Sequence, residues 1–172
     1  MTDYQFSRGT DHAPRITTFY KESMTPNVLI CDSERDLETH FRHDFIAHID
    51  GKATPTLRKF YEEIADLLEI PHFGFTLEAL NDALNDLGWL EDERIILYIT
   101  DTDDFISKER DPAKIGSLLS MLDATAEDWK WVSDEENIEP KELVLVFENS
   151  VRICQLLDNE AIRYRQLSTL NE

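Results

Sequence analysis

Three carboxylates recur at four-residue spacing between positions 78 and 86, and their type and spacing suit the binding of positive charge. Glu78, Asp82 and Asp86 fall on one stripe of a helix, and leucines fall on the opposite stripe. Like charges four residues apart destabilise a helix by about 0.2–0.5 kcal/mol per pair. A ladder of this kind indicates a surface for a cation or a cationic protein; the alternative is the ordinary solvated face of a helix in an acidic protein.

The neighbouring sequence offers these carboxylates no opposite charge. From Phe60 to Glu93 the chain has ten acidic residues and neither lysine nor arginine. The helix that carries them is well delimited, because Thr76 is suited to cap its start and Gly88 to end it. We therefore predict a short helix whose exposed face is acidic along its whole length.

Other combinations of reactive residues in the sequence do not match a known metal, cofactor or catalytic motif. Residues 101–104 read Asp-Thr-Asp-Asp but lack the glycine and the later glutamate of an EF-hand calcium loop. His40 and His43 have no third and fourth metal ligand nearby. There is no phosphate-binding glycine loop, nucleophile elbow or cysteine–histidine signature, and exposed carboxylates on one helix lack the pocket that acid–base catalysis needs. We expect no catalytic residue, no metal and no cofactor.

Composition restricts the class of protein. The chain has 172 residues, 41% of them hydrophobic, which is enough for a single domain with its own core. Its longest apolar runs are strand-sized, and its start lacks the basic-then-apolar pattern of a signal peptide. Cys31 and Cys154 are isolated in the sequence, which favours a reduced, cytoplasmic protein. We expect no contact with a membrane.

The charge balance points to the kind of partner. The chain has 17 basic and 36 acidic residues, and its formal net charge of −19 exceeds what solubility requires. Such a charge argues against direct binding to nucleic acid or anionic lipid, because both need basic patches. It favours a basic protein partner, whose approach the negative field would accelerate.

The elements that must position the acidic helix alternate between strands and helices. Continuous apolar runs and β-branched residues predict strands at 27–31, 44–50, 94–100 and 143–147. Caps and helical periodicity predict helices at 36–43, 57–69, 77–87, 112–124 and 151–166. Residues 126–132 either continue the fourth of these helices or form another. This order predicts an α/β domain with right-handed crossovers.

Three segments of the chain carry a resemblance to a known family. They are Ile49-Asp50-Gly51, residues 68–74 (Leu-Glu-Ile-Pro-His-Phe-Gly) and residues 77–84 (Leu-Glu-Ala-Leu-Asn-Asp-Ala-Leu). Together with the strand that follows and the order of elements, they resemble the barstar family of ribonuclease inhibitors.

The resemblance covers roughly residues 44–148 and implies a fold. That fold is a small parallel sheet of about three strands packed with helices, within a single domain over residues 1–172. Residues 1–43 would form an N-terminal extension, and residues 149–172 would form a C-terminal helix.

The resemblance also implies a function. In that family the acidic helix and the loop before it block the active site of a ribonuclease, and the acids stand in for the phosphates of RNA. Glu78 and Asp82 would enter the active site. The remaining contacts implied for the partner are Asn81, Asn85, Asp86, His72, Phe73, Trp89, Asp123 and Glu127.

The implied protein is an immunity protein of a toxin–antitoxin or contact-dependent inhibition system, and its partner is a basic nuclease toxin, in the first place a ribonuclease. Asn81 stands where the family often has a large aromatic residue, and the loop from Pro71 to Leu77 is one residue short, so the toxin is not identified. Two other classes of function stay open. They are a nucleic-acid mimic that occupies a DNA-binding protein, and a scaffold whose acidic surface only keeps it soluble.

Overall fold

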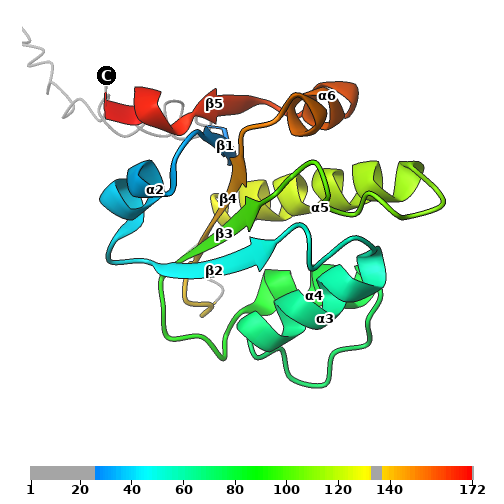
Figure 1. Cartoon of the computed structure of the whole chain (residues 1–172). Helices are drawn as coiled ribbons and strands as arrows, with labels where there is room; N and C mark the ends of the chain where they lie inside the picture. The colour runs from blue at the N-terminus through cyan, green and yellow to red at the C-terminus, as the bar shows by residue number, and fades with distance from the viewer. Residues whose placement is uncertain (1–25, 133–136, 172) are drawn as a thin grey trace, which may run out of the picture.

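A wholly parallel sheet organises the part of the chain that the computed structural model describes, residues 26–132 and 137–171 (Figure 1). Its strands are β1 (Val28–Cys31), β2 (Phe45–Asp50), β3 (Arg94–Thr100), β4 (Glu142–Glu148) and β5 (Tyr164–Gln166). Their order across the sheet is β2-β3-β4-β1-β5. The predicted α/β class is confirmed, but the sheet has five strands rather than about three.

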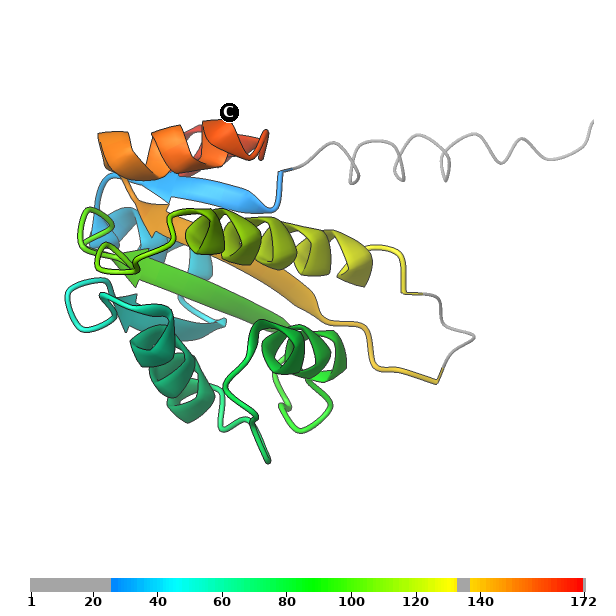
Figure 2. The same cartoon turned by 90° about the vertical axis from the view of Figure 1, so that its right-hand side faces the viewer.

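Helices cover both faces of the sheet and give three layers. One face carries α3 (Leu57–Leu67), α4 (Leu77–Asp86), α5 (Ala113–Trp129) and α6 (Val151–Asn159); the other carries α2 (Glu34–Phe41) and the 3-10 helix η2 (Leu167–Asn171). Figure 2 shows α5 running along the sheet between α6 and α4. Alternate residues of β3 enter the two cores, with Leu97 under the larger helical layer and Tyr98 under α2.

The start of the described chain pairs within this sheet, and residues 1–25 of the implied N-terminal extension lie outside the described residues. β1 lies between β4 and β5, where Val28 is paired with both Leu145 and Tyr164. Ser33 caps α2, which starts at Glu34, two residues before the predicted position. Local patterns predict the strand itself but not its neighbours, because those pairings join segments far apart in the sequence.

The end of the chain also departs from the prediction. The final helix, α6, was expected to reach Gln166 but ends at Asn159. Ala161 then takes a left-handed backbone conformation with φ of 55°, and the chain returns to the sheet as β5. The alternative left open for α5 is also decided, since α5 continues without a break to Trp129.

Ile30→Ala should lower the free energy of unfolding by about 2–5 kcal/mol, because Ile30 in β1 is fully buried and its loss leaves a cavity. Val151→Ala is the control: Val151 is 76% exposed, and we expect a change within about 0.5 kcal/mol. Urea unfolding of both variants measures the difference. Equal, small effects would show that β1 is not part of the cooperative core.

Candidate partner-binding surface

Helix α4 has one buried and one exposed side, as its sequence pattern predicts. Thr76 caps its start, where the Thr76 hydroxyl accepts a hydrogen bond of 3.1 Å from the Ala79 amide. Leu80, Leu84 and Leu87 are fully buried in the larger core. Burying this leucine stripe forces the opposite stripe of the helix into solvent.

Helix α5 holds α4 in place through two polar contacts. The buried indole Nε1 of Trp129 donates a hydrogen bond of 2.8 Å to the Leu84 carbonyl, one of the last carbonyls of α4, which have no partner within the helix. One turn earlier, the Thr125 hydroxyl lies 3.3 Å from Asn81 Oδ1. Asn81 therefore lies at the border between α4 and α5, and its side chain is only partly exposed.

The exposed stripe of α4 carries Glu78, Asp82, Asn85 and Asp86. Within the described residues, neither Glu78 nor Asp82 has a hydrogen bond or an ion pair through its carboxylate. Asn85 donates to both the carbonyl and the side-chain oxygen of Asn81, at 2.8 and 3.2 Å. The structure thus brings the two central acids together on an open surface and leaves their charges uncompensated.

The end of α4 is formed differently from the prediction. Gly88 was expected to end the helix, but the left-handed residue is Leu87, with φ of 47°. The Leu87 amide still bonds back to the Ala83 carbonyl at 3.1 Å, and its side chain enters the core. The Gly88 amide instead donates to the Asp86 carboxylate at 3.2 Å. Burial of Leu87 offsets the steric cost of its backbone conformation.

The loop before α4 is tightly bent and packed on α3. Glu69, His72 and Phe75 all have left-handed backbones, with φ values of 50°, 53° and 53°. His72 is exposed, whereas Phe73 is partly buried and meets Tyr61 edge to face at 6.1 Å. Of the two predicted rim residues in this loop, only His72 is free to meet a partner with its whole side chain.

Trp89 follows α4 and was predicted to lie at the rim. Its indole Nε1 donates a hydrogen bond of 2.8 Å to the Leu68 carbonyl at the end of α3, and its ring packs against the larger core. Part of the ring is exposed. Trp89 therefore joins the ends of α3 and α4, and only part of its side chain is open to a partner.

The structure does not bring Asp123 and Glu127 onto the surface of α4. Thr125, which faces α4, lies between them in sequence, and positions two residues away point to the other side of a helix. Asp123 Oδ1 and Glu127 Oε2 accept hydrogen bonds of 3.0 and 3.1 Å from the side-chain amide Nδ2 of Asn27, the residue before β1. Both acids stabilise the junction of α5 and β1.

Two residues beside the surface were not anticipated. Phe75 is 37% exposed, and the Arg58 guanidinium lies 4.4 Å from the centre of its ring. Burial, and next the charge of Glu78, raise the pKa of the Tyr61 hydroxyl beneath them. The sequence signal was the Phe73–Phe75 pair, but which ring turns outward depends on the left-handed backbone at Phe75.

Among the described residues, no group of three or more His, Cys, Asp or Glu side chains is arranged to hold a metal ion. None of the helices in residues 26–132 and 137–171 combines the length and the apolar character of a membrane span.

Comparison with known proteins gives one family. The family model described as Barstar (barnase inhibitor) matches residues 45–148, which run from the first residue of β2 to the last residue of β4. This is more than half of the chain and includes the whole of α4. No curated protein sequence matches the chain.

Comparison with solved structures gives matches of low sequence identity. A chain of Drosophila ORC bound to GC-rich DNA and Cdc6 matches with a TM-score of 0.51 and 12% identity, over 97% of this chain and 63% of that one. The Aeropyrum pernix ORC2 protein gives a TM-score of 0.49 and 11% identity, over 95% and 49%. Cdc6p from Pyrobaculum aerophilum gives 0.48 and 13%, over 96% and 48%. At 12% identity, the match to the Drosophila ORC chain shows a similar fold alone. The chain spans less than two thirds of each of these proteins.

Glu127→Gln should lower the free energy of unfolding at neutral pH. It should also make that free energy fall less steeply as the pH is lowered. Burial tends to raise the pKa of Glu127, but hydrogen bonds from Lys130, Asn27 and Trp131 outweigh it and hold the pKa below its ordinary value. Such a group stabilises the fold above its unfolded pKa, and this contribution is lost as the pH falls through the folded pKa. Unfolding in urea from about pH 6 down to about pH 3 measures the effect. If the exposed control Glu91→Gln reduces the pH dependence of the free energy of unfolding by as much, the role given to Glu127 is wrong.

Proposed function

The chain belongs to the barstar family, and from this premise we propose that it inhibits a basic ribonuclease by covering the active site of that enzyme with α4. The observation that carries the proposal is the pair of exposed, unpaired carboxylates Glu78 and Asp82, which lies within the segment that the family model matches. The enzyme would be a toxin, and this chain would be its immunity protein.

The acid pair would act by taking the place of RNA. Residues four apart on a helix have Cβ atoms about 5–6 Å apart, so Glu78 and Asp82 present two neighbouring negative charges. A ribonuclease binds successive phosphates with arginine, lysine and histidine, and these cations would pair with the carboxylates instead. Because α4 is held rigidly by its leucines and by Trp129, little conformational freedom is lost on binding.

Residues beside the pair would complete the contact. Asn85 and Asp86 flank it on the exposed stripe, and Asn81 borders it on the α5 side. His72 would touch the partner from the loop before α4, and the exposed side of Trp89 would touch it beyond the end of the helix. Phe73 would support the loop from beneath. We leave Asp123 and Glu127 out of this surface because Asn27 engages both.

The proposed action is steric and electrostatic and needs no catalysis by this chain. A helix that fills the substrate groove excludes RNA directly, while the negative field of a chain with net charge −19 attracts the basic enzyme. In this proposal the protein acts in the cytoplasm of the cell it protects, as one half of a toxin–immunity pair.

Asp82→Ala and Glu78→Ala should each weaken inhibition while leaving the fold intact. Removing one member of a buried charge pair costs about 2–5 kcal/mol of affinity, a range to which the barnase–barstar complex itself contributed. We expect the larger loss for Asp82, which lies nearer the middle of the helix and has the shorter side chain to immobilise. Inhibition constants with barnase, and with any nuclease encoded beside the gene, measure the effect.

The matched control is Glu38→Ala, an exposed glutamate on α2, which lies on the opposite face of the sheet. It removes the same charge and should leave inhibition unchanged. Urea unfolding should find Asp82→Ala and Glu78→Ala as stable as the parent, or more stable by a few tenths of a kcal/mol. A greater loss of inhibition in Glu38→Ala than in Asp82→Ala would place the binding surface elsewhere. If the parent protein inhibits neither barnase nor a nuclease encoded beside the gene, the proposed function is refuted.

The association rate should fall steeply as salt is added, and the dissociation rate should change less. Charges further apart than about 8–10 Å are screened at physiological ionic strength, whereas buried contacts are screened little. Stopped-flow mixing with the nuclease at several salt concentrations measures both rates. The association rate of the double variant Glu78→Ala/Asp82→Ala should depend less steeply on salt than that of the parent.

The control for the salt experiment is Glu34→Ala/Glu38→Ala, an exposed pair with the same four-residue spacing on α2. Its net charge equals that of the α4 double variant. An equal flattening in both would assign the effect to net charge rather than to α4. An association rate indifferent to salt would favour a scaffold over an inhibitor.

A further inference from the structure

A pocket of about 730 Å³ opens between the start of α3, the loop before α4 and the loop before α5. Its apolar lining consists of Leu57 and Tyr61 from α3, Phe75 from the loop, and Leu77 from the first turn of α4. Sites for small molecules commonly have volumes of about 300–1,000 Å³ and mainly apolar walls. In size and lining, the pocket therefore suits a small molecule.

The rim of this pocket is basic in a chain that is otherwise strongly acidic. Arg58, Lys108, Arg110 and Lys114 line it, whereas the net charge of the whole chain is −19. The carboxylate among the lining residues is Glu109, whose Oε2 accepts a hydrogen bond of 2.9 Å from the Leu57 amide at the start of α3. The other Glu109 oxygen lies 3.5 Å from Lys114 Nζ. Lys114 is thus paired with Glu109, and the remaining cations of the rim are Arg58, Lys108 and Arg110.

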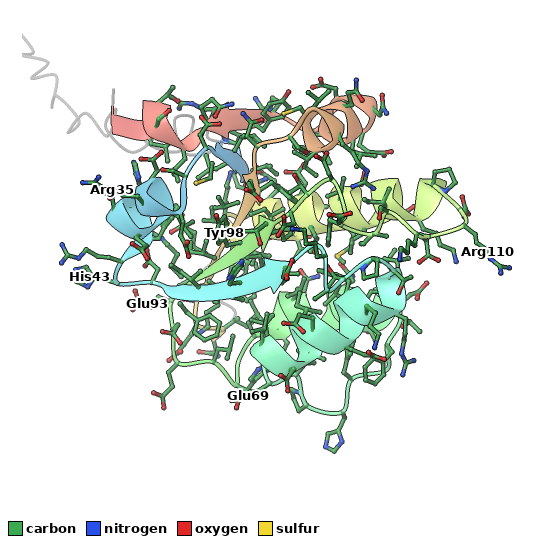
Figure 3. All side chains as sticks on the ribbon, viewed as in Figure 1. Arg35, His43, Glu69, Glu93, Tyr98 and Arg110 are labelled. Atoms are coloured by element: carbon green, nitrogen blue, oxygen red, sulfur yellow. The ribbon has the colours of Figure 1, made fainter. Side chains whose placement is uncertain are left out.

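Two of the four cations are available to a ligand. Arg58 is paired with Glu62 at 3.0 Å and lies over the Phe75 ring. Lys108 and Arg110 are exposed, and within the part of the chain that the structure describes their side chains have no ion pair or hydrogen bond. Figure 3 shows Arg110 extending from the loop before α5 into solvent. Uncompensated cations beside an apolar floor are complementary to an anion with an apolar body.

The loop that carries these cations is held firmly. Ile106 is buried and has a left-handed backbone with φ of 52°, which is rare for a β-branched residue. Its amide donates to the Thr54 carbonyl at 2.9 Å, and the Lys108 amide donates to the Pro55 carbonyl at 2.8 Å. These bonds fix the loop against the start of α3, so the pocket exists before any ligand arrives.

We propose that this pocket binds a small amphipathic anion, with an aromatic or apolar body on the Tyr61–Phe75 floor and a phosphate or carboxylate group at Lys108 and Arg110. Binding here uses none of the exposed acids of α4, although Leu77 at the start of α4 lines the pocket. The two activities can therefore succeed or fail separately.

Phenyl phosphate is the probe, because it combines the two features in one small molecule. Calorimetric titration should give a Kd of about 1–10 mM, as expected for a ligand of so few atoms. Its two halves, inorganic phosphate and phenol, should each bind at least about fivefold more weakly. In two-dimensional NMR spectra, the amide signals that shift should belong to residues 56–58, 75–77 and 108–114. Guanosine 5′-monophosphate, which has the same two features on a larger body, should bind more tightly.

Lys108→Ala/Arg110→Ala should abolish the titration. The matched control is Arg163→Ala/Arg165→Ala, which removes two exposed cations at the same spacing beside and within β5, at the opposite edge of the sheet from β2. This control should bind the probe as the parent does, and thermal unfolding should show both variants folded. No binding at 10 mM, equal binding of inorganic phosphate, or equal loss in both variants would overturn the proposal.

Discussion

The surface of α4 depends on how this helix is fastened to the rest of the molecule. Three fully buried leucines turn the acidic stripe outward, and the Trp129 indole satisfies a carbonyl at the end of α4 from the neighbouring helix. The hydrogen bond gives a partner to a carbonyl that has none within α4, and it links the position of α4 to that of α5. The repulsion between the exposed acids is small beside the free energy of burying the leucines. Packing therefore determines where the charges lie, and the fold tolerates the electrostatic cost.

The match to the barstar family covers only part of the sheet. The matched residues, 45–148, comprise β2, β3 and β4 with the helices between them. β1 and β5 add to the β4 side of these strands, while α3 and α4 lie towards β2, so the added strands lie away from the acidic surface (Figure 1). The additions enlarge the core on both faces of the sheet, through Ile30 on one face and Leu29 on the other. They extend the family fold without covering α4.

Charge is distributed unevenly over this molecule. The acids of α4 and the basic rim of the pocket meet at the start of the helix, where Leu77 lines the pocket and Glu78 faces solvent. Neither group neutralises the other through an ion pair within the described residues. Opposite potentials side by side restrict the orientations in which a charged partner can approach, because a rotated partner would place like charges together. For the proposed basic enzyme, this face would combine attraction with selectivity over the orientation in which it docks.

The sequence alone was enough to predict strands β3 and β4, the threonine caps of α3 and α4, and the exposure of Glu78 and Asp82. Each follows from neighbours within one or two turns, where hydrophobic periodicity and capping act. The tertiary structure alone decided the positions of Asp123 and Glu127, the inward contacts of Trp89, and the entry of β1 into the sheet. These depend on contacts between residues distant in sequence, such as Asn27 with α5 and Val28 with Leu145. Periodicity predicts which side of an element is buried, but not which other element buries it.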